Sequence, residues 1–178
     1  MFDLQEFVTD CQAAIAEPEP RLAIKQVLDR AVADPTLPEA LPPARAEIVK
    51  LHVADDLTIL KVVWTPGMSV APHDHRMWAA IGVYTGAEDN AFFRRDRSTL
   101  VASGGRTLRP GDVCLLGDDV IHGVTNPSGR HAGAIHVYGG DLFATPRSEW
   151  RGDPLTEEPN DPARTIALFE AANADTAA

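Results

Sequence analysis

Three histidines in two short segments have the residue type and the spacing of a metal site. In Pro72-His73-Asp74-His75 the histidines are two residues apart, and alternate residues of a β-strand point to the same face. A shared cation explains two adjacent neutral imidazoles better than packing does. His122 is the natural third ligand, because it follows a short apolar segment that resembles a strand. The alternative is that each is an ordinary core or surface histidine. The isolated His52 and His131 are expected to be surface residues.

Short strands and tight turns must position these side chains. Val, Ile, Leu and aromatic residues recur in short runs that glycine and proline turns separate, which predicts a mainly β fold of the sandwich, barrel or jelly-roll type. The turns include Thr65-Pro66-Gly67, Thr85-Gly86 and Ser103-Gly104-Gly105. The expected strands begin near Ile48 and continue with 57–64, 78–84, 91–95, 99–101, 113–116 and 134–138.

The first 45 residues have a different pattern. Apolar residues at three- and four-residue steps predict one helix that ends near Pro18 and a second that closes at Asp34-Pro35. Four prolines in residues 35–43 predict a linker or wrapping loop. We therefore expect a helical segment and linker at 1–45, a barrel at 46–145, and a tail at 146–178. A short helix over 162–172 should pack outside the barrel.

The histidine segments resemble the two motifs of the cupin family. Gly67-x5-His73-x-His75, followed by Gly86, is similar to the first motif, and Gly111-x5-Gly117-x4-His122-x3-Asn126 is similar to the second. The second departs from the family pattern, with Gly117 and Asp119 where proline and glycine are usual. The resemblance covers about residues 46–145. It implies a cupin double-stranded β-helix, or jelly roll, with the N-terminal helices packed outside.

The first motif lacks the glutamate that most cupins carry four or five residues after the second histidine. Ala79 and Ala80 occupy those positions, and we expect Glu88 and Asp89 to lie too far away. Three histidines without a carboxylate resemble the cysteine dioxygenase family of thiol dioxygenases, which implies an iron(II) cofactor. Three neutral ligands leave the full dipositive charge on the metal, which favours an anionic substrate thiolate. Nickel, zinc and copper remain open alternatives.

A second element supports this resemblance. His136 and Tyr138 alternate on a predicted strand and should share a face. They match the Ser-x-His-x-Tyr element of thiol dioxygenases, with Ala134 in place of the serine, so that His136 would be less firmly oriented. The resemblance implies that Tyr138 lies beside the iron. The cysteine that crosslinks to this tyrosine in animal relatives has no counterpart in 78–80.

A thiol that carries a carboxylate needs a cation to bind it. Arg147, nine residues after Tyr138, could reach the site as a downstream arginine does in mercaptopropionate-type relatives. Lys50 is the nearest basic candidate upstream, without a clear alignment. Strand alternation directs Arg76 away from the face of His73 and His75.

Composition excludes several classes of function. The net charge is −10 and the pI about 4.9, with no dense basic stretch, which disfavours nucleic acids and anionic membrane surfaces. The start of the chain lacks the pattern of a signal peptide, and no run is long enough to span a bilayer. Cys11 and Cys114 are expected to be reduced thiols, with Cys114 buried in a strand. We therefore expect a cytoplasmic monomer or small homo-oligomer.

These features favour a mononuclear non-haem iron dioxygenase whose partners are O2 and a small thiol of the cysteine or 3-mercaptopropionate type. In this hypothesis His73, His75 and His122 bind iron, Tyr138 and His136 act in catalysis, and Arg147 binds substrate. Two alternatives remain. One is another metal-dependent cupin enzyme with a non-thiol substrate, and the other is a non-catalytic cupin that binds a small ligand.

Overall fold

A computed structural model describes residues 1–97 and 99–176 of the chain. The helices are α1 (Leu4–Ala14), α2 (Pro20–Ala33), α3 (Leu37–Ala40) and α4 (Pro162–Thr176). The strands are β1 (Glu47–Val53), β2 (Thr58–Trp64), β3 (Ser69–Asp74), β4 (Ala79–Thr85), β5 (Glu88–Asp96), β6 (Thr99–Leu108), β7 (Val113–Leu116), β8 (Ile121–Thr125), β9 (Ala132–Tyr138), β10 (Ser148–Arg151) and β11 (Thr156–Pro159).

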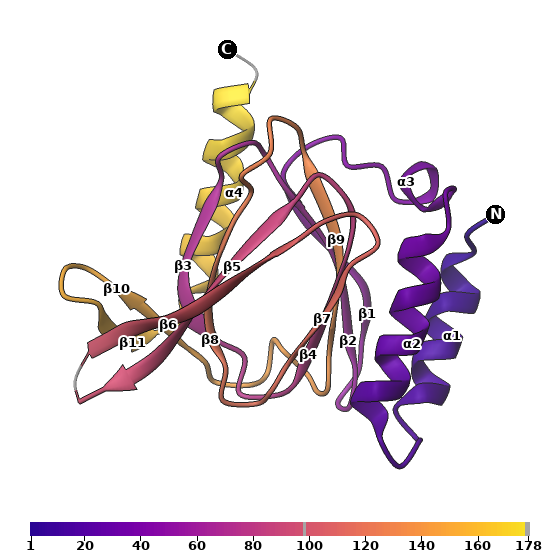
Figure 1. Ribbon diagram of the computed structural model, residues 1–178, viewed down its shortest axis with the longest axis horizontal. Coiled ribbons are helices and arrows are strands. Elements are labelled where there is room, and N and C mark those ends of the chain that lie inside the picture. The colour runs from indigo at the N-terminus through magenta and orange to yellow at the C-terminus, as the bar shows by residue number, and fades with distance from the viewer. Residues whose placement is uncertain (98, 177–178) are drawn as a thin grey trace.

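Two antiparallel sheets face each other and form a barrel (Figure 1). The first has the order β1-β2-β9-β4-β7, and the second has the order β11-β10-β3-β8-β5-β6. Non-consecutive strands lie side by side in both sheets, as in a jelly roll. This arrangement confirms the predicted mainly β fold of the jelly-roll type, with helices at the N-terminus.

Strand β2 shows how one segment serves two cores. All seven of its residues are buried, because one face points into the barrel and the other lies under the helices. Leu60 and Val62 belong to the core inside the barrel, whereas Ile59 belongs to the core beneath α1 and α2. Burial on both faces explains why the sequence shows a continuous apolar run here, without the alternation of a half-exposed strand.

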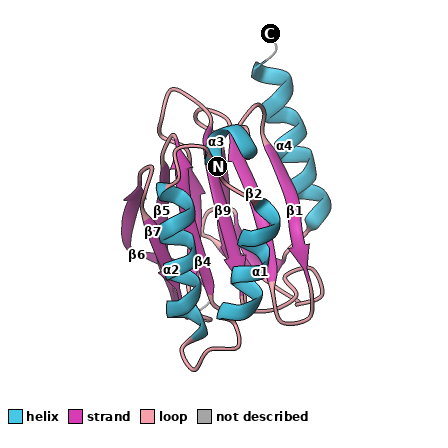
Figure 2. Ribbon diagram, turned by 90° about the vertical axis from the view of Figure 1, so that its right-hand side faces the viewer, coloured by secondary structure: helices cyan, strands magenta, loops and turns pink. Residues whose placement is uncertain are grey.

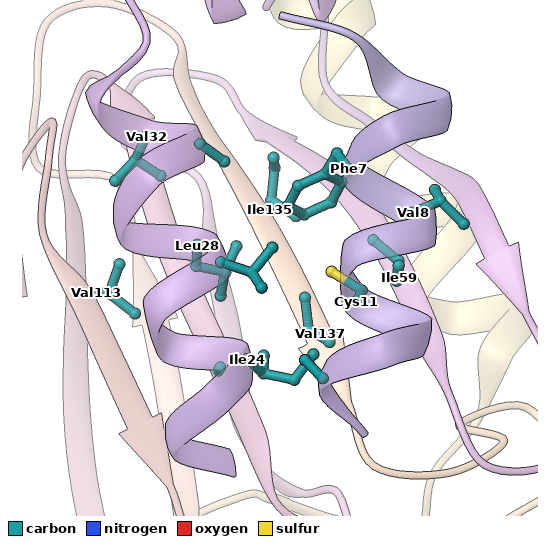
Figure 3. Packing of buried hydrophobic residues seen from close by; sticks show 14 of the residues in the cluster. Phe7, Val8, Cys11, Ile24, Leu28, Val32, Ile59, Val113, Ile135 and Val137 are labelled. Carbon is teal, nitrogen blue, oxygen red and sulfur yellow. The ribbon is translucent and has the colours of Figure 1, made fainter. Parts of the chain in front are cut away.

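Helices α1 and α2 cover the outer face of the first sheet (Figures 1 and 2). Asp3 caps α1 by accepting hydrogen bonds from the backbone N–H groups of Gln5 and Glu6, and α2 begins with a proline, which needs no N–H partner in the first turn. The apolar stripes of both helices meet the sheet in the packing drawn in Figure 3, where Cys11 and Leu28 are fully buried. Complete burial of a leucine contributes about 1.5–3 kcal/mol.

Two of the predicted tight turns join strands at the expected positions. In Thr65-Pro66-Gly67-Met68 the N–H of Met68 donates to the carbonyl of Thr65, and Gly67 adopts a φ of 76°. At Gly86, with a φ of 69°, an added Cβ would lie 2.5 Å from the backbone of Ala132. Glycine is needed there for both the dihedral angle and the close approach of the chain to β9.

Two expectations for local structure were wrong. The proline-rich stretch contains the short helix α3, because Pro38 falls in its first turn, where the missing N–H costs no hydrogen bond. Ser103-Gly104-Gly105 does not form a turn but lies inside β6, where the pairing with β5 shifts register beside it. Gly104 adopts a φ of 144°, which accommodates this irregularity in a continuing strand.

The segment after residue 146 contributes more to the barrel than expected. Strands β10 and β11 were not predicted, and β10 extends the second sheet by pairing Glu149 with His73. Helix α4 packs against the outside of the barrel, as predicted, but it extends to Thr176, and the buried Phe169 is among its residues that line a cavity. None of the described helices combines the length and the apolar character needed to cross a membrane.

Candidate functional site

Neighbouring strands bring the three predicted histidines together. His73 of β3 pairs directly with His122 of β8, and His75 follows the end of β3 by one residue. The ring centroids lie 4.7 Å apart for His73 and His122, 5.1 Å for His73 and His75, and 4.9 Å for His75 and His122. Their ligand atoms all lie within 4.8 Å of one another. They are the only such group of three or more residues in 1–97 and 99–176.

Hydrogen bonds determine which nitrogen of His122 is free. The amide nitrogen of Asn90 donates to a carboxylate oxygen of Glu88 at 3.0 Å, so the amide oxygen of Asn90 faces His122. His122 Nδ1 lies 2.7 Å from that oxygen and must donate to it. The lone pair of His122 Nε2 is therefore available, and this atom lies 3.3 Å from Nε2 of His75.

Burial keeps the three imidazoles neutral. The pKa of His73 is lowered to about 4 by burial, with a further lowering by the charge of Arg147. Burial also lowers the pKa values of His75 and His122 far below the usual range, and the neighbouring histidines add to this effect. His73 Nδ1 lies 3.0 Å from the carbonyl oxygen of Ala71, which leaves its Nε2 free when Nδ1 donates.

These three neutral imidazoles could hold a metal ion. Metals bind histidine through the unprotonated nitrogen, and a hydrogen bond at the other nitrogen fixes the tautomer and orients the ring. His122 and His73 both have such a bond. The donor set suits a divalent transition metal, but three imidazoles do not by themselves select one metal.

Glu88 was expected to be remote, and the structure places it against the site. Its side chain is 0% exposed and accepts hydrogen bonds from Trp64 Nε1 at 3.0 Å and from Asn90. Glu88 also contacts His136 Nε2, at 3.4 Å. Although burial raises the pKa of Glu88, the charge of His136 and the hydrogen bonds lower it overall. Glu88 is outside the converging ligand group, so it supports the site without joining the three histidines.

His136 and Tyr138 share a face of β9, as predicted. His136 Nδ1 lies 3.1 Å from the Tyr138 hydroxyl, and the Tyr138 ring packs edge-on against His75 with centroids 4.9 Å apart. Glu88 provides the orienting contact for His136 that Ala134 cannot. Burial raises the pKa of Tyr138 well above its ordinary value, so the phenol remains a hydrogen-bond donor at neutral pH.

The histidines open onto a cavity of about 840 Å³. Side chains from β1, β2, β3, β8, β9 and α4 line it, and Tyr138, His136 and Arg147 are among them. Apolar residues predominate elsewhere on the walls, among them Leu60, Val62, Val70, Val124, Leu142 and Phe169. A cavity of this size can enclose a drug-sized ligand.

Arg147 lines this cavity, and its side chain has no hydrogen-bond partner in the described part of the chain. Its Nε is the one buried side-chain nitrogen or oxygen without a hydrogen bond among residues 1–97 and 99–176, and its guanidinium makes no ion pair there. Burial lowers the pKa of Arg147 despite the opposing influence of Tyr138 and two carboxylates. Leaving a buried charged donor unpaired costs about 1–3 kcal/mol or more, which an anionic ligand would offset.

Other basic residues have different surroundings. Lys50 lines the cavity with its Nζ 3.7 Å from the centroid of the Phe143 ring. Arg76 points away from the histidines, as expected, and its Nε lies 2.6 Å from the carboxylate of Asp74. Arg164 is paired with Glu149, so its charge is already neutralised.

Sequence reasoning missed Glu88, Asn90 and the residues of α4. Glu88 and Asn90 are two apart on β5, and this same spacing made His73 and His75 conspicuous. The spacing of Glu88 and Asn90 could therefore have indicated that both side chains lie on the same face of a strand. Nothing in the sequence of α4 indicates that Phe169 covers Trp64, with ring centroids 5.4 Å apart.

No family model matches the chain. Several solved structures that resemble this chain are described as cupins or as double-stranded β-helix proteins. An uncharacterised conserved protein from Klebsiella pneumoniae with a double-stranded β-helix domain is 16% identical, with a TM-score of 0.48 over 62% of this chain and 85% of that one. A cupin superfamily protein from Desulfitobacterium hafniense is 18% identical, with a TM-score of 0.46 over 57% and 86%.

A third solved structure is Peruvianin-I, a cysteine peptidase from Thevetia peruviana latex. It is 21% identical, with a TM-score of 0.41 over 48% of this chain. The matched region spans about half, 51%, of that chain. At these similarities no activity is transferred from any of the three proteins.

Proposed function

We propose that this protein is a mononuclear iron(II) dioxygenase that converts a small thiol acid to a sulfinate. The observation that carries the proposal is a group of three neutral histidines without a carboxylate, facing a cavity that also holds Tyr138 and an unpaired Arg147. Three neutral ligands leave a dipositive metal to be neutralised by its substrate, which favours a thiolate.

The reaction balances without a further reductant. A thiol and O2 give a sulfinic acid: the S–H bond and the O–O bond break, and two S–O bonds and one O–H bond form. Sulfur loses four electrons, and O2 accepts all four. Bound iron would supply the redox chemistry that lets O2 react with the thiolate, while the protein ligands leave open positions for both.

Arg147 would bind the carboxylate of the substrate. A guanidinium offers a planar fork of donors that matches a carboxylate, and Nε is part of that fork. Arg147 lies close enough to the site for its charge to affect the pKa values of His73 and Tyr138. An acid held there would present its thiol to the histidines.

Tyr138 and His136 would manage the thiol proton. The Tyr138 hydroxyl would donate its proton to His136 Nδ1, which lies 3.1 Å away, while the phenol oxygen accepts the proton of the thiol. The buried carboxylate of Glu88 stabilises the charge that His136 would then carry. In this scheme the network holds the proton while both oxygen atoms are transferred.

Tyr138→Phe should keep its iron and turn over thiol about 10- to 100-fold more slowly, since one hydrogen bond to a charged group is lost. The measurement is kcat beside iron content. Tyr84→Phe is the matched control, because the Tyr84 hydroxyl donates to the Leu41 carbonyl, outside the site. Equal rates for Tyr138→Phe and the wild type would remove Tyr138 from the mechanism.

The proposal is tested by oxygen consumption with anaerobically purified, iron(II)-loaded protein. The panel contains cysteine, cysteamine, 3-mercaptopropionate, a diketone and a catechol. We expect rapid uptake with a thiol that carries a carboxylate, and slow uptake with cysteamine, which has none to bind Arg147. The large apolar cavity also fits a second candidate, a metal-dependent cupin enzyme with a non-thiol substrate. Uptake with the diketone or the catechol alone would favour that candidate.

A further inference from the structure

The cavity is much larger than cysteine or 3-mercaptopropionate. A thiol acid of six or seven non-hydrogen atoms displaces roughly four or five waters, on the order of 130 Å³. The cavity measures about 840 Å³. A small substrate would therefore leave most of this space filled with water.

The unused part of the cavity is apolar. Along β2, Leu60 lies opposite His136, and Val62 and Trp64 follow in the direction away from Tyr138. On the facing sheet, Val70 and Val124 pair with each other beyond His73 and His122. Water against such walls is poorly held, so an apolar group that displaces it gains affinity.

Helix α4 closes this apolar part and is held in place at both ends. Near its start, Arg164 forms ion pairs with Glu149 and with Glu158. Near its end, the Asn173 side chain bonds the N–H of Ala46 at 2.8 Å and the carbonyl of Ala46 at 2.9 Å. Between these anchors Phe169 is buried against Trp64. The wall is thus built into the fold.

We propose that the substrate carries an apolar chain or ring in addition to its acid and thiol groups, and that this apolar part lies between β2 and α4. Its carboxylate binds Arg147, which leaves the apolar part to extend past the histidines along Leu60 and Val62. The inference that the substrate has a thiol group rests on the proposed function. The inference that it is an apolar carboxylic acid rests on the cavity and Arg147 alone.

Binding of saturated carboxylates to the metal-free protein tests the inference without iron or thiol chemistry. The series is propanoate, butanoate, hexanoate and octanoate, followed by calorimetry. Affinity should rise about fourfold for each added methylene, which corresponds to the usual gain on burying a CH2 group. Equal affinities across the series would overturn the proposal.

Three variants locate the ligand. Arg147→Gln should weaken every acid by about 10- to 100-fold and leave the dependence on chain length unchanged. Val62→Phe should fill the apolar part, so that octanoate loses its advantage while propanoate binds as before. Val49→Phe is the matched control, because Val49 lies on β1 outside the cavity lining and is 36% exposed. Val49→Phe should change the affinity for neither octanoate nor propanoate.

Each other outcome is decisive. Loss of binding in Lys50→Gln with no effect of Arg147→Gln would overturn the placement of the carboxylate. Chain-length dependence without oxidation of any thiol would support the apolar-acid ligand and remove the dioxygenase proposal. Oxidation of short thiols, together with carboxylate binding that does not depend on chain length, would support the dioxygenase proposal and overturn the apolar-acid ligand.

Discussion

His122→Ala protein should be isolated with less than about a tenth of an iron ion per chain and should not oxidise thiols. Changes in outer-shell partners alone usually cost 10- to 100-fold in metal affinity, and removing a ligand costs more. His122 is buried and its free Nε2 lies 3.3 Å from Nε2 of His75, so no other side chain can easily replace it. The measurement is metal content after anaerobic loading, with oxygen uptake on the same sample.

A graded comparison separates ligand loss from general damage. His131→Ala removes a histidine outside the group and should keep both iron and turnover. Asn90→Ala removes the acceptor of His122 Nδ1 and should lower iron affinity by about 10- to 100-fold without abolishing it. Thiol oxidation by His122→Ala at the wild-type rate would contradict the ligand assignment.

Metal-free protein should lose stability steeply as the pH falls from about 6.5 to 4.5. The pKa of His73 is lowered to about 4 by burial, and burial also lowers those of His75 and His122 well below the usual range, whereas an unfolded histidine titrates near 6.5. Within this window the unfolded chain binds protons that the folded chain does not, so acid favours unfolding. Each such histidine contributes at most about 1.4 kcal/mol per pH unit, so the slope for three can reach about 4 kcal/mol per unit.

The same window distinguishes histidines from carboxylates. Burial raises the pKa of Glu88, but His136 and hydrogen bonds lower it overall. The contribution of Glu88 to the free energy of unfolding is therefore lost only below its ordinary pKa of 4.5. Urea unfolding of metal-free protein at half-unit pH intervals measures the slope. His73→Gln should reduce the slope by about a third. A free energy of unfolding that is constant between pH 6.5 and 5 would show that the histidines titrate normally in the folded state.

The barrel could be predicted because its signals are local. Turns such as Thr65-Pro66-Gly67 need particular dihedral angles, and buried strands such as β2 need β-branched and apolar residues. Strands β10 and β11 were missed because their sequences, Ser148–Arg151 and Thr156–Pro159, are short and polar. Ionic contacts help to hold them, such as Arg76 with Glu157, which joins residues distant in sequence.

The site was predictable to the extent that it follows strand alternation. His73, His75, His136 and Tyr138 could be assigned to shared faces, because residues two apart point the same way. The partnership of Glu88 with His136 could not be assigned, because it joins β5 to β9 across the barrel at a sequence separation of 48. The same is true of α4, since only the closed barrel brings Phe169 over Trp64.

The most direct test of thiol dioxygenation is the product formed under ¹⁸O2. Iron-loaded protein is supplied with the most reactive thiol of the panel in unlabelled water, and the product is analysed by mass spectrometry. A sulfinate that carries two ¹⁸O atoms, with one O2 consumed per thiol, is the predicted result. A disulfide without label, or a product with only one ¹⁸O atom, would contradict dioxygenation at this site.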